Sequence, residues 1–152
     1  MTSSRNGFPW KDLDEKSCLT VGVPFPRLAA VDIGTTSFRC IVVEVDPQEG
    51  FRVLDDEKTP VRLNEGFNQT GKITPVAHNR AIEALQRMNK IITGLGANLV
   101  KVVATSAVRK AGNREAFIHE IKAATDLDIE VISGNAEADL ALYHRKAAPK
   151  KV

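Results

Sequence analysis

The chain has 152 residues, of which 43% are hydrophobic and 26% are charged, a balance typical of one globular domain with its own core. A formal net charge of +2 is too small to indicate binding to nucleic acid or to an anionic membrane. No apolar run is long enough to cross a bilayer and residues 1–10 lack the apolar stretch of a secretory signal, so we expect a cytoplasmic protein. Cys18 and Cys40 are far apart and predict free thiols.

The first half of the chain predicts an extension followed by three strands. Glycines and prolines break residues 1–27, which we expect to form a disordered or loosely attached extension. Strands are expected at about 28–33 and 38–45, and the nearly continuous apolar run of the second suits a strand covered on both faces. A third strand at about 51–63 is charged and interrupted by Pro60, which fits the edge of a sheet.

Helices and strands alternate in the second half. Thr74 and Pro75 suit the start of a helix that ends at Gly94. The further expected elements are a strand at 99–104, a helix capped by Asn113, a strand at 128–132, a helix at about 136–145 and a fraying basic tail at 146–152. The order βββαβαβα predicts an α/β domain over residues 28–145, with a mixed five-stranded sheet and helices on its faces. This order resembles the ribonuclease H-like half-unit shared by actin, sugar kinases and chaperone ATPases.

The loop after the first strand carries a cluster of polar residues. Gly34 permits a close bend or a positive φ, and Thr35, Thr36 and Ser37 add three hydroxyl groups to the backbone N–H groups of the turn. Such a set suits phosphate oxygens, and Asp32 at the strand end could hold Mg²⁺ directly or through water. The same spacing also fits an ordinary hairpin with polar turn residues.

Two later loops follow the expected fourth and fifth strands, and parallel strands bring such loops to one edge of the sheet. Arg109 can bind a phosphate with two N–H groups, and the helix that starts after Ser133 and Gly134 favours an anion. Glu137 is either a surface charge in the first helical turn or a base that takes a proton from an attacking water. Together these groups predict phosphoryl transfer to water.

The motifs carry a family resemblance over about residues 29–143. They are Ala-Val-Asp-Ile-Gly-Thr-Thr-Ser-Phe-Arg at 30–39, Arg62-Leu63 followed by Gly66, Ala-Thr-Ser-Ala-Val-Arg at 104–109 followed by Asn113, and Ile-Ser-Gly-Asn-Ala-Glu-Ala at 132–138. They resemble the exopolyphosphatase/guanosine pentaphosphate phosphohydrolase (Ppx/GppA) family. The resemblance implies that Glu137 is the catalytic base, that Arg109 binds phosphate and that Asp32 lies near Mg²⁺. It also implies polyphosphate or guanosine pentaphosphate as the substrate.

This sequence departs from the family pattern at two places. Thr36 stands where the family usually has an asparagine, so one amide contact to phosphate is missing. Family members continue into a second domain with the loop Asp-x-Gly-Gly-Gly-Ser, which has no match here. We therefore expect one wall of a site, incomplete alone, that a second domain or chain completes. The alternatives are a non-catalytic polyphosphate-binding or regulatory module and a sugar-kinase-like ATP-binding fragment. His78 and His119 have no second ligand at metal spacing and are expected to be solvated.

Overall fold

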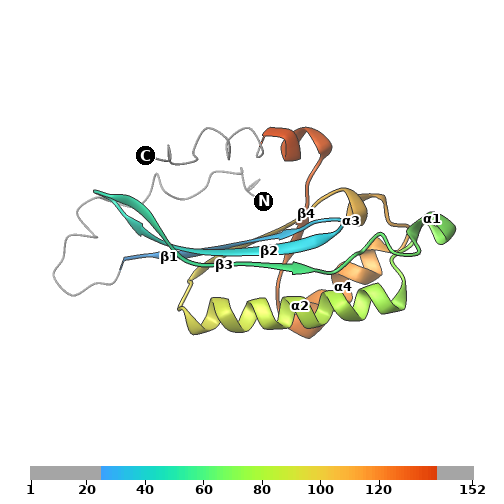
Figure 1. Ribbon diagram of the computed structural model, residues 1–152, viewed down its shortest axis with the longest axis horizontal. Helices are drawn as coiled ribbons and strands as arrows, with labels where there is room; N and C mark the ends of the chain where they lie inside the picture. Colours follow the sequence, from blue (N-terminus) through green and yellow to red (C-terminus); the bar gives the residue numbers. More distant parts are fainter. Residues whose placement is uncertain (1–24, 140–152) are drawn as a thin grey trace, which may run out of the picture.

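The computed structural model describes residues 25–139 of the chain (Figure 1). The elements are β1 (Arg27–Ile33), β2 (Ser37–Asp46), β3 (Gly50–Pro60), α1 (Phe67–Thr70), α2 (Pro75–Gly94), β4 (Leu99–Ala104), α3 (Ser106–Lys110), α4 (Arg114–Thr125) and β5 (Ile129–Val131), followed by helical residues 134–139. β1 begins one residue inside the expected extension. Residues 1–24 of that extension, the end of the last helix and the basic tail lie outside the described residues.

The strands form one mixed sheet in the order β3-β2-β1-β4-β5. β1, β2 and β3 are antiparallel neighbours, whereas β4 and β5 run parallel to β1. The register pairs Ile33 with Ala104 and Ala104 with Val131, so the carboxyl ends of the three parallel strands lie side by side. The expected mixed five-stranded sheet is confirmed, and β3 lies at its edge as its charges predicted.

The two faces of the sheet differ in their cover. α2 and α4 lie against one face, whereas residues 134–139 lie on the opposite side of the sheet (Figure 1). Along β1, Val31 and Ile33 are buried against the helices and Asp32 between them points the other way. In β2 the buried positions alternate with half-buried ones, so the expectation of complete cover on both faces is wrong for the part described.

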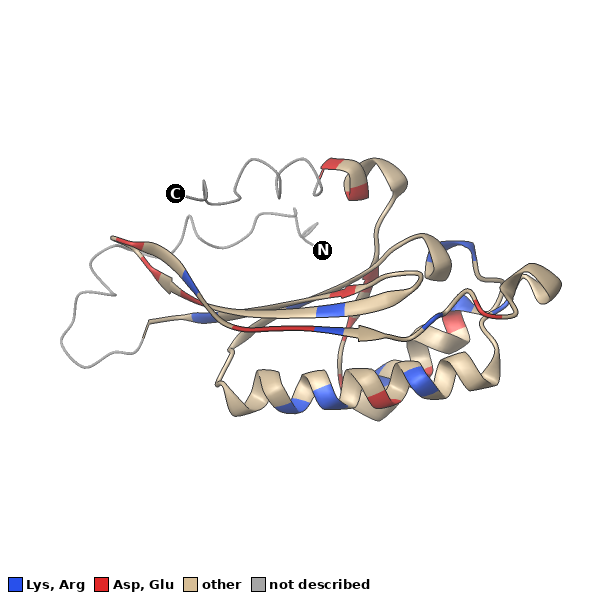
Figure 2. Cartoon of the chain, in the orientation of Figure 1, with Lys and Arg blue, Asp and Glu red and all other residues tan. Residues whose placement is uncertain are grey.

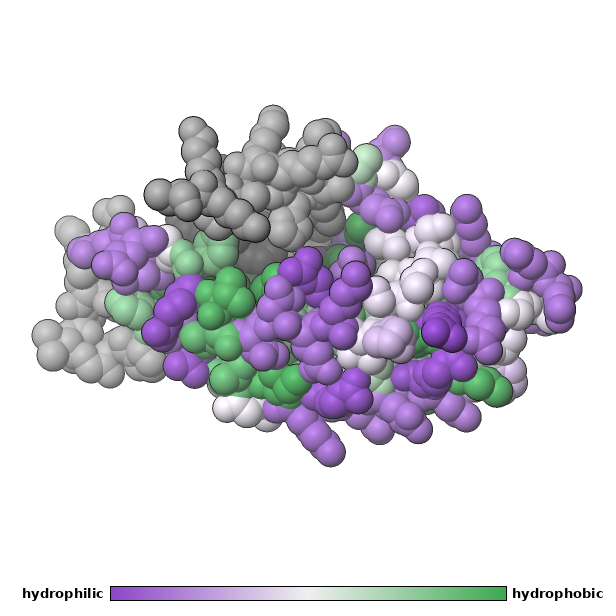
Figure 3. All heavy atoms as spheres, in the orientation of Figure 1, coloured by the Kyte–Doolittle hydropathy of each residue, from purple (hydrophilic) through white to green (hydrophobic). Residues whose placement is uncertain are grey.

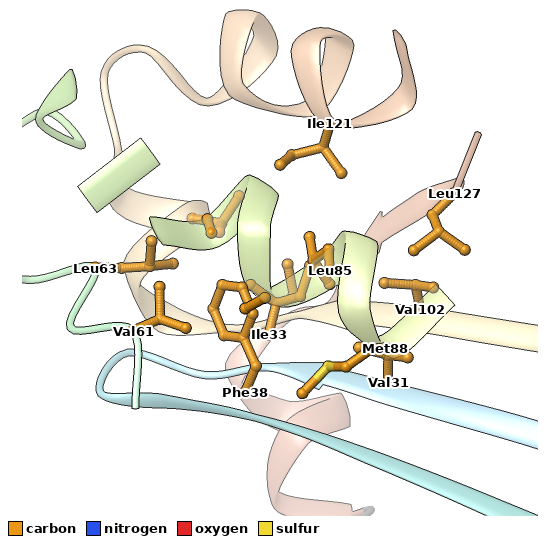
Figure 4. Packing of buried hydrophobic residues seen from close by; sticks show 14 of the residues in the cluster. Val31, Ile33, Phe38, Val61, Leu63, Leu85, Met88, Val102, Ile121 and Leu127 are labelled. Carbon is orange, nitrogen blue, oxygen red and sulfur yellow. The ribbon is translucent and has the colours of Figure 1, made fainter. Parts of the chain in front are cut away.

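The core lies between the sheet and α2. The buried stripe of α2 consists of residues at helical spacing, namely Ala77, Ala81, Ala84, Leu85, Met88 and Ile92. Phe38 and Ile33 from the sheet pack with this stripe and with Val61 and Leu63 from the segment after β3 (Figure 4). Each large apolar side chain buried in this way contributes about 1.5–3 kcal/mol to folding.

The structure differs from the expected elements at three places. β3 ends at Pro60, earlier than expected, because proline lacks the N–H group that would continue the ladder and Arg62 takes a positive φ of 54°. The segment between β3 and α2 contains the short helix α1. The residue before this helix, Gly66, has the left-handed backbone conformation. The segment after β4 folds as the short helix α3, where a loop was expected. These two short helices add to the order without changing the sheet.

Asn113 does not cap α4 with its side chain. Its Oδ1 accepts a hydrogen bond from the Ile73 N–H and its Nδ2 donates to the Ile73 carbonyl, both at 3.0 Å. Next to this pair, the N–H of Gly112 donates to the carbonyl of Gly71 at 2.9 Å. Asn113 therefore joins the start of α4 to the loop before α2. By contrast, Thr74 does cap α2, accepting from the N–H of Ala77 at 3.2 Å.

His78 is not solvated as expected. Its side chain is 15% exposed, its ring packs 5.2 Å from the ring of Phe117, and its Nε2 lies 3.0 Å from Glu120 Oε2. Helical spacing placed His78 on the polar side of α2, but α4 covers that position. His119 is exposed, as predicted.

Charges of both signs are interspersed along α2 and β3 (Figure 2). Hydrophilic residues make up most of the face visible in Figure 3, with hydrophobic areas gathered toward the left of that view. Within residues 25–139, no helix combines the length and the hydropathy that a membrane crossing requires.

Candidate active site

The turn between β1 and β2 is tight, and its first position, Gly34, has room only for a glycine. A Cβ on Gly34 would lie 2.6 Å from the carbonyl oxygen of Ser37, closer than any real contact. The glycine is therefore needed for close approach, and its φ is not in the left-handed region. The carbonyl groups of Thr35 and Thr36 accept hydrogen bonds from the segment after β3.

The second loop is tied directly to the first strand. The N–H of Thr105 donates to the carbonyl of Ile33 at 3.3 Å, and its hydroxyl lies 3.5 Å from the same oxygen. Thr105 is buried and comes just before α3, and its carbonyl accepts from the N–H of Arg109 at 2.9 Å. α3 thereby carries Arg109 from the end of β4 toward the end of β5.

Arg109 joins the second loop to the third. Its Nη1 donates to the carbonyl of Ile132 at 2.8 Å and lies 3.5 Å from Glu137 Oε2. The N–H of Ile132 in turn donates to the carbonyl of Ala104 at 3.0 Å. One guanidinium group thus holds both the backbone after β5 and the carboxylate of the following helix.

Ser133 starts the helical segment that carries Glu137. Its hydroxyl accepts from the N–H of Ala136 at 3.1 Å, and its carbonyl accepts from the N–H of Glu137 at 3.0 Å. This is the geometry of a helix N-cap. The hydroxyl expected to bind phosphate therefore serves the helix start, and Gly134 beside it is exposed.

Asp32 is electrostatically coupled to Glu137. The pKa of Asp32 is raised from its ordinary value, first because the surrounding chain desolvates the carboxylate and second because Glu137 is negative nearby. Arg39, its cross-strand neighbour in β2, opposes this effect. Residues 134–139, which include Glu137, lie on the side of the sheet toward which Asp32 points (Figure 1).

Arg39 is a site-edge residue that the sequence analysis did not single out. It pairs with Asp56 through two hydrogen bonds, Nε to Oδ1 at 2.9 Å and Nη2 to Oδ2 at 2.6 Å. This contact raises the pKa of Arg39. The signal that could have found it is the alternation of β2, which puts Arg39 on the same face as Asp32.

The carboxylates near the ends of the parallel strands are the candidate ligands for Mg²⁺. Within the described part of the chain, no group of three or more His, Cys, Asp or Glu side chains could hold a metal ion. Mg²⁺ usually keeps several waters and takes one or two carboxylates together with substrate phosphates. Asp32 and Glu137 offer such carboxylates. The pKa of Asp32 is raised first by desolvation and second by the negative charge of Glu137, and a cation between the two carboxylates would oppose the second effect. The residues present therefore fit a magnesium ion shared with a phosphate.

Two hollows of the surface lie away from these residues. One, near the start of β5, is lined by Asn89, Thr93, Val100, Val102, Thr125, Asp126, Leu127 and Asp128. The other, at the β2–β3 hairpin, is lined by Phe25, Glu44, Asp46, Glu49, Gly50, Phe51 and Arg52. Neither contains a residue of the three loops, so the candidate site lies on the sheet edge outside both hollows.

The sheet order, the parallel strand ends and the three joined loops define a half-unit of ribonuclease H type with polar loops on one edge. Residues 41–145 match the model of the Ppx/GppA phosphatase family. Exopolyphosphatase 2 of Mycobacterium tuberculosis is 35% identical over 128 residues, which cover 76% of this chain and 39% of that protein. The guanosine-5'-triphosphate,3'-diphosphate pyrophosphatase of Aeromonas hydrophila is 30% identical over 113 residues, 74% of this chain and 23% of that one.

Solved structures agree with these relatives. The exopolyphosphatase from Cytophaga hutchinsonii superposes with a TM-score of 0.72 at 32% identity, covering 75% of this chain and 36% of that chain. A Ppx/GppA family member from Aquifex aeolicus gives a TM-score of 0.72 at 28% identity, covering 75% and 37%. The chain belongs to the Ppx/GppA phosphatase family. It spans well under half the length of these relatives.

Proposed function

We propose that this chain supplies one wall of a site that hydrolyses the terminal phosphoanhydride bond of inorganic polyphosphate or guanosine pentaphosphate. The observation that carries the proposal is the placement of Glu137, which lies 3.5 Å from Arg109 and is coupled to Asp32 at the end of β1. Base, cation and loop carboxylate are thus grouped beside a turn rich in N–H and hydroxyl groups. Membership of the family, whose relatives carry the names given above, supports the same reaction.

In this mechanism Glu137 accepts a proton from the water that attacks the terminal phosphorus, and the rest of the phosphate chain leaves. Arg109 keeps Glu137 in place through Nη1, which leaves its Nη2 for a phosphate oxygen. The turn of Gly34, Thr35, Thr36 and Ser37 binds further oxygens, and positioning supplies most of the rate. Asp32 would hold Mg²⁺ directly or through water, and an ion at this place would supply positive charge against the phosphate oxygens.

We further propose that the opposite wall comes from a second domain or chain. The three loops lie at one open edge of the sheet, and the matched part of the Cytophaga hutchinsonii protein is 36% of that chain. A wall on the other side would exclude water and bind the phosphates from a second direction. A non-catalytic polyphosphate-binding module is the second candidate, and the same observation favours it.

Phosphate release from polyphosphate and from guanosine pentaphosphate, measured with Mg²⁺, tests the proposal. Glu137→Gln is the diagnostic variant, because it keeps the side-chain size and removes the base. Glu115→Gln, at an exposed carboxylate in the first turn of α4, is the matched control. Release that is lost in Glu137→Gln and kept in Glu115→Gln supports hydrolysis by this chain.

Release that persists in Glu137→Gln contradicts the assigned role of Glu137. If the wild-type chain binds inorganic tripolyphosphate but releases no phosphate, the binding module is favoured. In that case the domain that follows in a full-length relative is added as a separate chain, and restored release that depends on Glu137 would support the two-wall site. ATP that displaces tripolyphosphate and transfers phosphate to a polyol would instead favour a sugar-kinase-like fragment.

A further inference from the structure

The segment after β3, residues 61–65, is hydrogen-bonded to the phosphate-loop candidate of the β1–β2 turn. We call it the Arg62 turn. The N–H groups of Val61 and Arg62 donate to the carbonyl of Thr36 at 2.9 and 2.8 Å, and the N–H of Leu63 donates to the carbonyl of Thr35 at 2.9 Å. Three donors thus hold two consecutive carbonyl groups of the loop.

These hydrogen bonds determine where the loop N–H groups point. In a planar trans peptide the C=O and the following N–H point in opposite directions. With the carbonyls of Thr35 and Thr36 turned toward the Arg62 turn, the N–H groups of Thr36 and Ser37 are directed away from it. Within residues 25–139, the N–H of Thr36 donates no hydrogen bond to another group of the fold. The Arg62 turn therefore aims the donors that a phosphate would meet.

Arg80 from α2 binds the carbonyl oxygens of the Arg62 turn, on the side of its peptide groups opposite the loop. Its Nε donates to the carbonyl of Val61 at 2.8 Å, and its Nη2 donates to the carbonyl of Arg62 at 3.2 Å. These two carbonyls belong to the peptide groups whose N–H atoms, of Arg62 and Leu63, bind the loop. Two parallel chains of hydrogen bonds run from the guanidinium group through the turn into the loop, and each bond polarises the next.

The position of the turn is fixed by its neighbours. Val61 and Leu63 are 1% and 0% exposed and pack into the core near Phe38 (Figure 4). Arg62 between them is exposed and takes the left-handed conformation, at φ 54°, which is costly for a residue other than glycine. Nη2 of Arg80 also lies 3.2 Å from Glu65 Oε2 at the end of the turn. The strained turn therefore persists because the core and Arg80 constrain it from both sides.

We propose that Arg80 is a positioning residue for phosphate binding by the β1–β2 turn, acting through the peptide groups of the Arg62 turn. The proposal rests on the function proposed above, because it names what orients the donors of that site. It assigns a role to the Arg-Leu motif at 62–63, which the catalytic groups leave unused. It also brings α2, a helix of the opposite layer, into the organisation of the site.

Arg80→Met tests the proposal, and Arg87→Met is the matched control. Arg87 lies two helical turns further along α2 and binds Glu57 and Thr59 of β3, each at 2.9 Å, without touching the Arg62 turn. Amide hydrogen exchange is measured without ligand, and affinity is measured for inorganic tripolyphosphate with Mg²⁺. Arg80→Met is expected to speed exchange at 61–63, whose N–H groups make the contact with the loop, and to weaken tripolyphosphate binding about tenfold, whereas Arg87→Met changes neither.

Two further variants keep the test decisive if Arg80→Met unfolds. Arg80→Lys keeps the charge but can satisfy only one of the two carbonyls well, so its exchange and affinity are expected between those of wild type and Arg80→Met. Arg62→Asn tolerates the left-handed backbone and removes the guanidinium group, so it should leave exchange of the Val61 and Leu63 amides unchanged. A tenfold loss of affinity in Arg62→Asn with unchanged exchange would show that the Arg62 side chain itself binds phosphate, and would overturn the proposal.

Exchange separates this proposal from the proposed function. If wild type does not bind tripolyphosphate, the phosphate site fails while faster exchange at 61–63 in Arg80→Met still supports the positioning contact. If wild type binds but exchange at 61–63 is the same in Arg80→Met and Arg87→Met, the phosphate site stands and the role of Arg80 is refuted.

Discussion

Asn113 offers the sharpest test of how the site is framed, because its sequence position and its structure assign it different roles. As the residue before α4 it should be an N-cap, and aspartate caps a helix as well as asparagine does. In the structure its amide instead binds both the N–H and the carbonyl of Ile73 at 3.0 Å. An aspartate can accept from the N–H but cannot donate to the carbonyl.

The expected cost follows from these two bonds. A hydrogen bond contributes about 0.5–1.5 kcal/mol, and a partly buried group left without its partner costs about 1–3 kcal/mol. Asn113→Ala, which removes both bonds, is therefore expected to lower the free energy of unfolding by about 2–3 kcal/mol. Asn113→Asp loses one bond and sets a carboxylate against the Ile73 carbonyl, at a cost of about 1–3 kcal/mol.

Urea unfolding at neutral pH measures both variants, and Thr74 supplies the control. Thr74 is a true cap of α2, so Thr74→Asp should be nearly neutral and Thr74→Ala should cost about 1 kcal/mol. The transition midpoint should move while its steepness stays constant. If Asn113→Asp is as stable as wild type, the amide bridge to Ile73 contributes nothing and the capping role is correct.

Three further predictions concern the sheet and its first turn. Gly34→Ala places a Cβ 2.6 Å from a backbone oxygen and should lower the free energy of unfolding by about 1–3 kcal/mol. Gly94→Ala, with open space around its Cβ, is the control and should be neutral or stabilising. Equal urea midpoints for the two variants would refute this prediction. Between the ordinary value of 3.8 and the raised pKa of Asp32, the folded chain holds a proton that the unfolded chain has released, so stability falls as pH rises through this window. Asp32→Asn should therefore unfold at higher urea than wild type at pH 7 but not below the window, and a lower midpoint at pH 7 would contradict the raised pKa. Burial, followed by the acidic residues of β3, raises the pKa of Cys40 to about 11, so in a Cys18→Ser background a thiol reagent at pH 7 should label Cys40 only as rapidly as the chain unfolds.

The elements that the sequence predicted well are those with a strong local signal. The helical spacing of apolar residues in α2 and the apolar runs of β1 and β4 are signals that several neighbouring residues share, and Thr74 followed by Pro75 marks the start of α2 by residue type. The parallel strand ends followed from the alternation of strands and helices, so the grouping of Asp32, Arg109 and Glu137 could be anticipated. Short helices such as α1 and α3 have too few residues for a period to appear.

Contacts between segments that are far apart in the sequence could not be predicted from local signals. Asn113 looks like a cap in its own neighbourhood, and only the approach of the loop before α2 gives its amide two better partners. Ser133 has a hydroxyl suited to phosphate, and in the structure this hydroxyl accepts a hydrogen bond from the N–H of Ala136 in its own helix. His78 follows the polar side of α2 until α4 packs over it.

The same distinction explains how the site is held. The groups that would meet a phosphate come from short motifs at strand ends. The orientation of the first loop, however, depends on Arg62 and Arg80, which follow Thr36 by 26 and 44 positions in the chain. A hairpin turn alone could point its N–H groups in several directions. Buried Val61 and Leu63 remove that freedom, because moving the turn would expose core side chains. The chemistry on one side of the sheet is therefore coupled to packing on the other, and a variant of α2 should alter phosphate affinity without touching a phosphate.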